Sequence, residues 1–266
     1  AYNKAAHGNG FSDEFVYSEV EKEYLEKYGD LTGDLHTDLH ECLGHGSGQL
    51  LPGVDPDALK AHGSTIEEAR ADLFGLYYLP DAKMRELGLT PHDDAYKAEY
   101  YSFMMNGLMT QLVRIELGNN VEEAHMRNRQ LIAKWVFEKG AGDKVVELVK
   151  KEGKTFVKIN DYDKLRDLFG QLLGEIQRIK SEGDYEAARQ LVENYAVQVD
   201  PELHKEVLAR YQKLNLAPYK GFVNPVYTAQ KDAEGNIVDV TISYEEGYAD
   251  QMLRYSRDYA NLPYEN

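Results

Sequence analysis

Helical patterning dominates the chain. Apolar residues recur at three- and four-residue intervals over most of its length, and capping residues, glycines and prolines divide this pattern into segments. Gly29 is a typical C-terminal residue of a helix, the Ser64-Thr65-Ile66-Glu67 capping box is a typical start, and Thr90-Pro91 is another. The sequence therefore predicts helices over residues 12–29, 32–43, 64–79, 90–117, 121–139, 161–182, 184–196, 201–213 and 245–259.

Two segments alternate in the manner of β-strands. Residues 144–160 carry short apolar stretches around Glu152-Gly153, and residues 223–244 do so around Glu234-Gly235. Such a pattern predicts a β-hairpin in each place. Because neither an internal repeat nor a low-complexity linker interrupts the chain, we expect one mainly α domain over residues 1–266 with one or two small β-hairpins.

Length and composition indicate a folded, soluble protein. The chain has 266 residues, of which 42% are hydrophobic, enough for a sizeable core. Its apolar runs are shorter than the roughly 18 to 20 residues that cross a bilayer, and no stretch is typical of a signal peptide. We expect no membrane partner and a cytoplasmic location. Because the sequence opens with Ala1 in mid-pattern, we also expect a fragment that lacks the true N-terminus.

Charge and cysteine content limit the chemistry. The formal charge of −16 repels phosphate backbones, so nucleic acid is an unsuitable partner, and the acidic residues are interpreted first as a solvated surface. The single Cys42 excludes an intrachain disulfide and a cysteine-based zinc cage, and we expect it to be a small buried residue that points away from any metal. A metal site must therefore be built from histidines and carboxylates.

Two short motifs carry the candidate chemistry. The first is His40-Glu41-Cys42-Leu43-Gly44-His45, on a predicted helix, and the second is Glu67-Glu68-Ala69-Arg70-Ala71-Asp72. Catalytic zinc is commonly held by two histidines and one carboxylate, with water in the fourth position, and a helix presents two imidazoles together. Glu41, next to the first histidine, is then placed to take a proton from that water.

The spacing of the two histidines departs from the usual helical zinc motif. A separation of five residues turns the second ring by about 140° on a regular α-helix, against about 40° for a separation of four. Gly44 tolerates a distorted backbone, and one extra residue is readily absorbed as a π-type bulge. We therefore predict a widened turn between His40 and His45.

Alternative interpretations of these residues remain open. His36 lies four residues before His40 and is a rival third ligand, although it lacks a following glutamate. Glu68 and Asp72, one turn apart, fit a solvated helix edge that pairs with Arg70 or a lysine.

The paired motifs resemble the dipeptidyl peptidase III family of zinc metallopeptidases. Gly46-Ser47-Gly48 and Ala124-His125-Met126 are also similar to that family, and the cysteine inside the first motif is similar to its bacterial members. The resemblance covers the chain from about His40 to Arg129. It implies a multi-helix zinc-binding catalytic lobe of a two-lobed exopeptidase, which releases N-terminal dipeptides from oligopeptides.

The resemblance also implies roles for individual residues. His40, His45 and Glu68 would bind one Zn²⁺, and Glu41 would be the general base. His125 would help to bind substrate or to stabilise the transition state, and Glu67 and Asp72 would hold the ligating imidazoles from behind. Arg129, one helical turn beyond His125, is a further candidate for holding a peptide carbonyl or carboxylate.

We expect the second lobe of such an enzyme to lie outside this chain. In the family that lobe is rich in β structure and grips the free amino end of the substrate. We therefore expect this fragment to hydrolyse dipeptidyl arylamides feebly or not at all. The rival function is a non-catalytic, zinc-stabilised module that binds peptides.

Overall fold

The computed structural model describes residues 10–216 and 223–260. The chain divides into two compact units, one over residues 8–215 and one that contains the C-terminal residues from 216 onward. The single domain over residues 1–266 stays a prediction. Within the described residues the chain is mainly helical with two antiparallel two-stranded sheets, as the sequence predicts.

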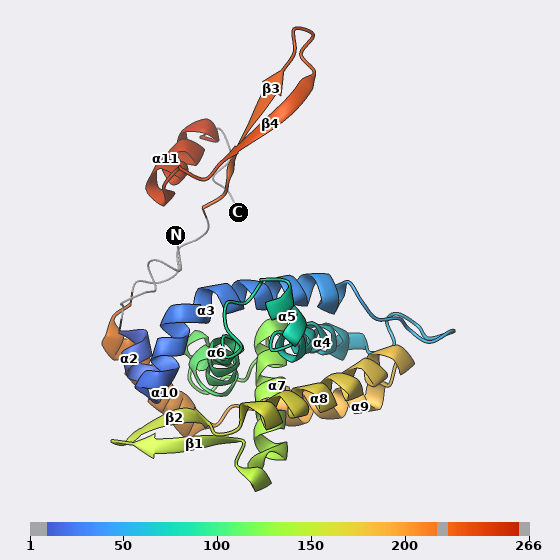
Figure 1. Ribbon diagram of the computed structural model, residues 1–266, viewed down its shortest axis with the longest axis vertical. Helices are drawn as coiled ribbons and strands as arrows, with labels where there is room; N and C mark the ends of the chain where they lie inside the picture. The colour runs from blue at the N-terminus through green and yellow to red at the C-terminus, as the bar shows by residue number, and fades with distance from the viewer. Residues whose placement is uncertain (1–9, 217–222, 261–266) are drawn as a thin grey trace. The chain divides into compact units, whose positions relative to one another are not determined.

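The larger unit is a bundle of helices with one hairpin at its side (Figure 1). Three short 3-10 segments lie between the longer elements, namely η2 (Lys60–His62), η3 (Thr110–Arg114) and η4 (Ala141–Asp143). Two π-helical segments, η1 (His40–His45) and η5 (Val192–Ala196), directly continue helices. The remaining elements are α2 (Phe11–Phe15), α3 (Glu19–Leu39), α4 (Gly63–Tyr78), α5 (Ala82–Glu86), α6 (Tyr96–Leu108), α7 (Ala124–Lys139), β1 (Val146–Lys151), β2 (Lys154–Ile159), α8 (Tyr162–Glu182), α9 (Tyr185–Leu191) and α10 (Pro201–Leu214).

Helix α4 lies at the centre of this unit. It packs against α3, α7, α8 and the π-helical turn η1, and in Figure 1 it lies between α3 and α8. Ile66, Ala69, Leu73 and Leu76 are fully buried along it. Because α4 is covered on several sides, charged residues on it are held in fixed surroundings, which is a condition for a rigid site.

Several predicted helix boundaries are wrong. The helix expected over residues 12–29 is interrupted, because α2 ends at Phe15 and α3 begins at Glu19. α3 continues through Gly29 and Gly33, because burial of residues such as Tyr28 and Leu35 offsets the roughly 1 kcal/mol cost of a helical glycine. The helix expected from residue 90 begins only at Tyr96, since the Thr90 amide and carbonyl bond back to Met84 and Arg85, and it ends at Leu108.

The prediction of a capping box at the start of α4 is also wrong. The N-cap is His62, no side chain caps the helix, and Ser64 lies inside its first turn. Glu67 does not fold back to cap the helix, because its carboxylate instead accepts hydrogen bonds from His45, Arg70 and Lys180. The predicted end before Pro80 is confirmed, as are the hairpin at 144–160 and helices close to 121–139, 161–182 and 201–213.

The smaller unit contains the second predicted hairpin and the last helix. β3 (Val226–Lys231) pairs with β4 (Ile237–Ser243), and α11 (Tyr248–Asp258) follows. The buried Gln251 side chain of α11 exchanges two hydrogen bonds of 2.7 Å with the backbone of Asn224 and so closes the unit. Across both units, the helices that the structure describes are too short or too polar to span a bilayer.

Candidate metal centre

The first histidine motif forms a π-helical turn at the end of α3. His40 is the C-terminal cap of α3 and the first residue of η1, and His45 is its last. The predicted widening is therefore confirmed. Gly44, in the middle of this turn, is buried against α4, and a Cβ atom there would lie 2.6 Å from Ala71 Cα. A glycine at this position lets η1 lie directly on α4.

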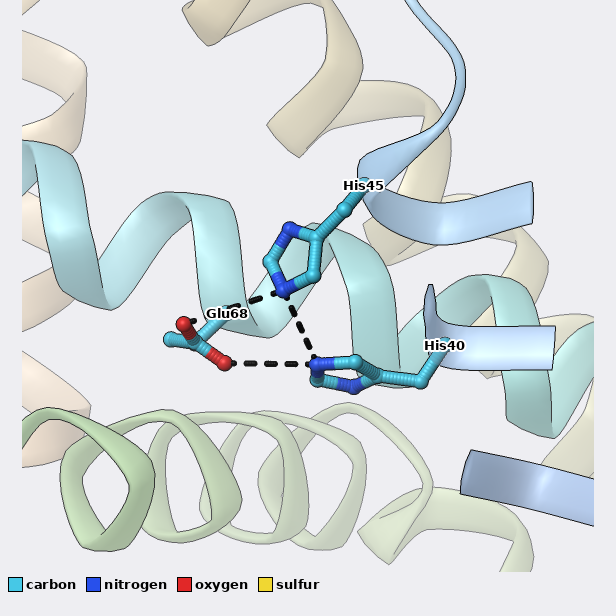
Figure 2. A group of neighbouring side chains, drawn as sticks. All are labelled: His40, His45 and Glu68. Carbon is cyan, nitrogen blue, oxygen red and sulfur yellow. Dashed lines mark hydrogen bonds and ion pairs between the residues drawn. The ribbon is translucent and has the colours of Figure 1, made fainter. Parts of the chain in front are cut away.

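Three side chains converge where η1 meets α4. His40 Nε2 lies 3.0 Å from His45 Nε2 and 3.4 Å from Glu68 Oε2, and His45 Nε2 lies 3.8 Å from Glu68 Oε1. Figure 2 shows the two rings and the carboxylate pointing toward one another. Bonds of 2.0–2.1 Å around a tetrahedral zinc place its ligand atoms about 3.3 Å apart. The three separations scatter around that value, so the cluster has the size of a single zinc site.

Hydrogen bonds fix the tautomer of both rings. His40 Nδ1 donates to Asp72 Oδ1 at 2.7 Å, and His45 Nδ1 donates to Glu67 Oε1 at 2.9 Å. Because a carboxylate only accepts, each Nδ1 carries a proton, and the Nε2 atom of each ring is left to face the other ring and Glu68. A metal ion bound between the two Nε2 atoms, which lie 3.0 Å apart, would accept a lone pair from each. The donor set therefore fits a metal ion.

Glu68 adds an acceptor without a hydrogen-bond partner. Its Oε2 atom is buried and makes no hydrogen bond within the described part of the chain, although His125 Nδ1 lies 3.1 Å away at ion-pair distance. A buried carboxylate oxygen left unsatisfied is costly in free energy. A cation beside this oxygen would remove that cost, and the interpretation of Glu68 as a solvated helix edge is wrong because its side chain is only 18% exposed.

The two carboxylates behind the rings are held ionised. Burial raises the pKa of Asp72, but the hydrogen bond from His40 and the charges of His36 and His40 outweigh burial and lower it. Burial likewise opposes ionisation of Glu67, and hydrogen bonds from Arg70, Lys180 and His45 bring its pKa down to about 2. Each imidazole is thus backed by a carboxylate, an arrangement that raises the basicity of a ligating histidine.

Arg70 ties the π-helical turn to α4. Its fully buried guanidinium donates to the Gly44 carbonyl at 2.6 Å and to Glu67 Oε1 at 2.9 Å. The solvated-edge interpretation supposed that Arg70 pairs with Glu68 or Asp72, but its carboxylate partner is Glu67. It joins the backbone of η1 to the carboxylate that orients His45.

A polar pocket of about 360 Å³ opens beside His40. Glu41, His125 and Arg129 all line it, so three residues that the sequence singled out face one cavity with the first ligand, whereas His45 and Glu68 do not line it. Arg114 and Asn106 also line the pocket, and the buried Asn106 Oδ1 has no hydrogen-bond partner among the described residues. Sequence reasoning missed both, because neither lies in a motif.

The structure argues against the rival ligand His36, and the expectation that Cys42 is buried is wrong. Both ring nitrogens of His36 are occupied, by Glu99 Oε1 at 2.7 Å and by the Asp72 carbonyl at 3.2 Å, so this ring is not free to bind a metal. Cys42 is exposed and not buried, and Gly44 is the residue of η1 that is buried.

The chain is similar to known proteins in sequence and in fold. A model of peptidase family M49 matches residues 55–250, a range that contains Glu68 and His125 and begins after His45. The structure is similar to that of DPP III from Caldithrix abyssi, with a TM-score of 0.58, 27% identity, and coverage of 78% of this chain and 36% of that one.

Dipeptidyl-peptidase III from Corallococcus sp. strain EGB is similar in fold, with a TM-score of 0.51, 24% identity, and coverage of 68% of this chain and 31% of that one. The chain thus spans about a third of the length of both proteins.

Proposed function

The chain belongs to peptidase family M49, and from that premise we propose that it is the zinc-binding catalytic part of a metallopeptidase that releases dipeptides from the N-terminus of oligopeptides. One observation carries the proposal. Two imidazoles whose Nδ1 atoms are held by carboxylates direct their Nε2 atoms, 3.0 Å apart, toward the carboxylate of Glu68.

The ligand number favours a catalytic site over a structural one. Among the described residues, the group that fits a metal consists of His40, His45 and Glu68. Structural zinc is generally closed by four protein ligands, whereas catalytic zinc keeps three and an open position. The pocket beside His40 supplies room for a substrate at that position.

Zinc bound here would polarise the scissile carbonyl and lower the pKa of its water. Glu41, which lines the pocket, would accept a proton from that water on its carboxylate and deliver it to the departing amine. His125 is 55% exposed at the same pocket, and its ring N–H would stabilise the oxyanion. Arg129 would hold a carbonyl or carboxylate of the peptide.

Substrate selection requires more than this chain. The two structures named DPP III extend well beyond it, since the chain covers only 36% and 31% of them. We propose that a second lobe grips the amino end of the substrate, and that the present chain binds zinc but hydrolyses dipeptidyl arylamides weakly or not at all. Its cytoplasmic location stays a prediction.

Glu41→Gln tests the catalytic assignment. The variant should retain one equivalent of zinc and lose about 10²- to 10⁴-fold in turnover of a dipeptidyl arylamide, the range expected for loss of a general base. Glu68→Gln is the matched control, because it removes a proposed ligand and should lose the zinc as well. Unchanged turnover in Glu41→Gln, or a wild-type chain without zinc, would contradict the proposal.

The same pair of variants separates the enzyme from a non-catalytic zinc module. If the present chain is inactive, the comparison is repeated on a chain extended at its N-terminus to the length of the two relatives. If the extended chain bound zinc but had no peptidase activity, Glu41→Gln would have no activity to abolish. That result would favour a module in which zinc only joins helices.

A further inference from the structure

His36 connects three helices directly behind the candidate metal centre. Its ring leaves α3 and lies between Glu99 on α6 and Asp72 on α4. The residue is only 7% exposed, and its ring also packs against Phe103, with 5.7 Å between centroids. This position is buried and fixed by contacts on both sides.

Both ring nitrogens of His36 face acceptors. Nδ1 lies 2.7 Å from Glu99 Oε1, and Nε2 lies 3.2 Å from the Asp72 carbonyl and 3.6 Å from Asp72 Oδ1. A neutral imidazole has a single N–H and satisfies one such partner, whereas the doubly protonated ring satisfies both. Burial opposes the charge, but the bond to Glu99 and the charges of Glu99 and Asp72 raise the pKa of His36 to about 9.

The backbone of α4 is shaped to admit this ring. Gly75 lies one turn after Asp72, and a Cβ atom at Gly75 would come within 2.1 Å of His36 Cδ2 and 2.7 Å of its Nε2. A larger residue there would push the ring off the Asp72 carbonyl. The glycine therefore allows His36 to reach both the main chain and the carboxylate of Asp72.

Asp72 contacts both His36 and the proposed ligand His40. The Oδ1 atom that lies 3.6 Å from His36 Nε2 accepts the 2.7 Å hydrogen bond from His40 Nδ1. A continuous chain of contacts thus runs from Glu99 through His36 and Asp72 to His40. Through this contact His36 holds the Asp72 carboxylate in the place where it accepts the Nδ1–H of His40 and so orients that ring.

We propose that His36, anchored by Glu99, is a positioning residue that fixes Asp72 against His40 and thereby sets the affinity of the site for its metal. The proposal rests on the proposed zinc site, but it assigns to His36 a role through another residue and not a bond to the metal. Glutamine at position 36 preserves a polar side chain, but it cannot donate in two opposite directions and carries no charge.

Zinc affinity measured by chelator competition tests this role. His36→Gln should weaken binding about 10- to 100-fold, the range for loss of a partner that orients a ligand, while one equivalent still binds. Asp72→Asn should weaken binding similarly. Because His36 acts through Asp72, the double variant should bind zinc within about twofold of Asp72→Asn alone. An effect of His36→Gln smaller than twofold, or full additivity with Asp72→Asn, would overturn the proposal.

His204→Gln is the matched control for losing a buried imidazole. His204 is 1% exposed, and its Nε2 donates to the carbonyls of Leu112 and Ile115 at 3.1 and 3.0 Å. This variant should lower the melting temperature and leave zinc affinity within twofold of wild type. If His204→Gln weakened zinc binding as much as His36→Gln, general loosening of the fold would explain both and the positioning role would be rejected.

A readout without metal separates this proposal from the zinc site itself. In ¹⁵N-histidine-labelled, metal-free protein, His36→Gln should convert the His40 signals from a single Nδ1–H tautomer to a mixture. An unchanged His40 tautomer would overturn the positioning role even if zinc binds. A wild-type chain that binds no zinc, with the His40 change still present, would reject the zinc site and retain the coupling from His36 to His40.

Discussion

Gly44→Ala is the sharpest test of how the π-helical turn builds the site. A Cβ atom at this position would lie 2.6 Å from Ala71 Cα, 2.7 Å from Ala71 Cβ and 3.1 Å from the Ala71 carbonyl oxygen. Non-bonded carbons prefer separations of about 3.5–4.0 Å. The contact involves α4 backbone and not the end of a flexible side chain, so η1 and α4 must move apart by about 1 Å to relieve it.

That displacement acts on both stability and metal binding. Overpacking of this kind typically costs about 1–3 kcal/mol. Zinc ligands tolerate deviations of only about 0.2 Å, and Glu68 lies on α4 whereas His45 lies on η1, with 3.8 Å already separating Glu68 Oε1 from His45 Nε2. We therefore expect zinc affinity to fall at least about tenfold, which equals 1.4 kcal/mol.

Gly29→Ala is the matched control. Gly29 lies inside α3, and a Cβ atom there would meet nothing within 4 Å. Replacing a solvent-facing helical glycine by alanine should stabilise the protein by about 0.5–1 kcal/mol. Thermal melts with and without zinc, together with chelator competition, measure both variants. Gly44→Ala with wild-type stability and zinc affinity would refute the close packing of η1 on α4.

Two further variants test the carboxylates of the larger unit. Glu67→Gln should weaken zinc binding about 10- to 100-fold by chelator competition and lower the melting temperature, because His45 loses an anionic acceptor and the buried Arg70 loses its partner; a wild-type affinity would contradict this. Burial raises the pKa of Glu206, but hydrogen bonds from Thr155 and Arg210 outweigh burial and lower this pKa overall. The stability that ionised Glu206 contributes is therefore complete above the ordinary glutamate pKa, and it is lost as the pH falls through the depressed pKa. In urea melts with EDTA, wild type should therefore lose more stability than Glu206→Gln as the pH is lowered from about 5, and parallel curves would exclude this role.

Local patterns predicted most of the secondary structure correctly. The hairpins at 144–160 and 223–244 and the helices after residue 121 follow from strand alternation, helical periodicity and capping residues, all of which act between near neighbours. Where local signals failed, tertiary contacts outweighed them. Gly29 has the signal of a helix end, yet α3 continues because residues on both sides of it pack against the core.

The sequence by itself determined the types of the proposed ligands and the need for a widened turn. A five-residue spacing of His40 and His45 cannot place both rings together on a regular α-helix, so the π-helical turn follows from helical geometry alone. Glu68 was identified from the resemblance of its motif and not from geometry, since a local sequence pattern gives no distance to residues more than twenty positions away.

Only the tertiary structure decided which hydrogen-bond partner each of the surrounding polar side chains has. Asp72 and Glu67 lie on one helix, yet each supports a different histidine because η1 crosses α4 at Gly44. His36 has the ordinary spacing for a metal ligand, but Glu99 and the Asp72 carbonyl occupy both of its nitrogens. Spacing along a chain fixes which residues can share a face, whereas the partner of each polar atom depends on which helices pack together and on the free energy of leaving a buried group unpaired.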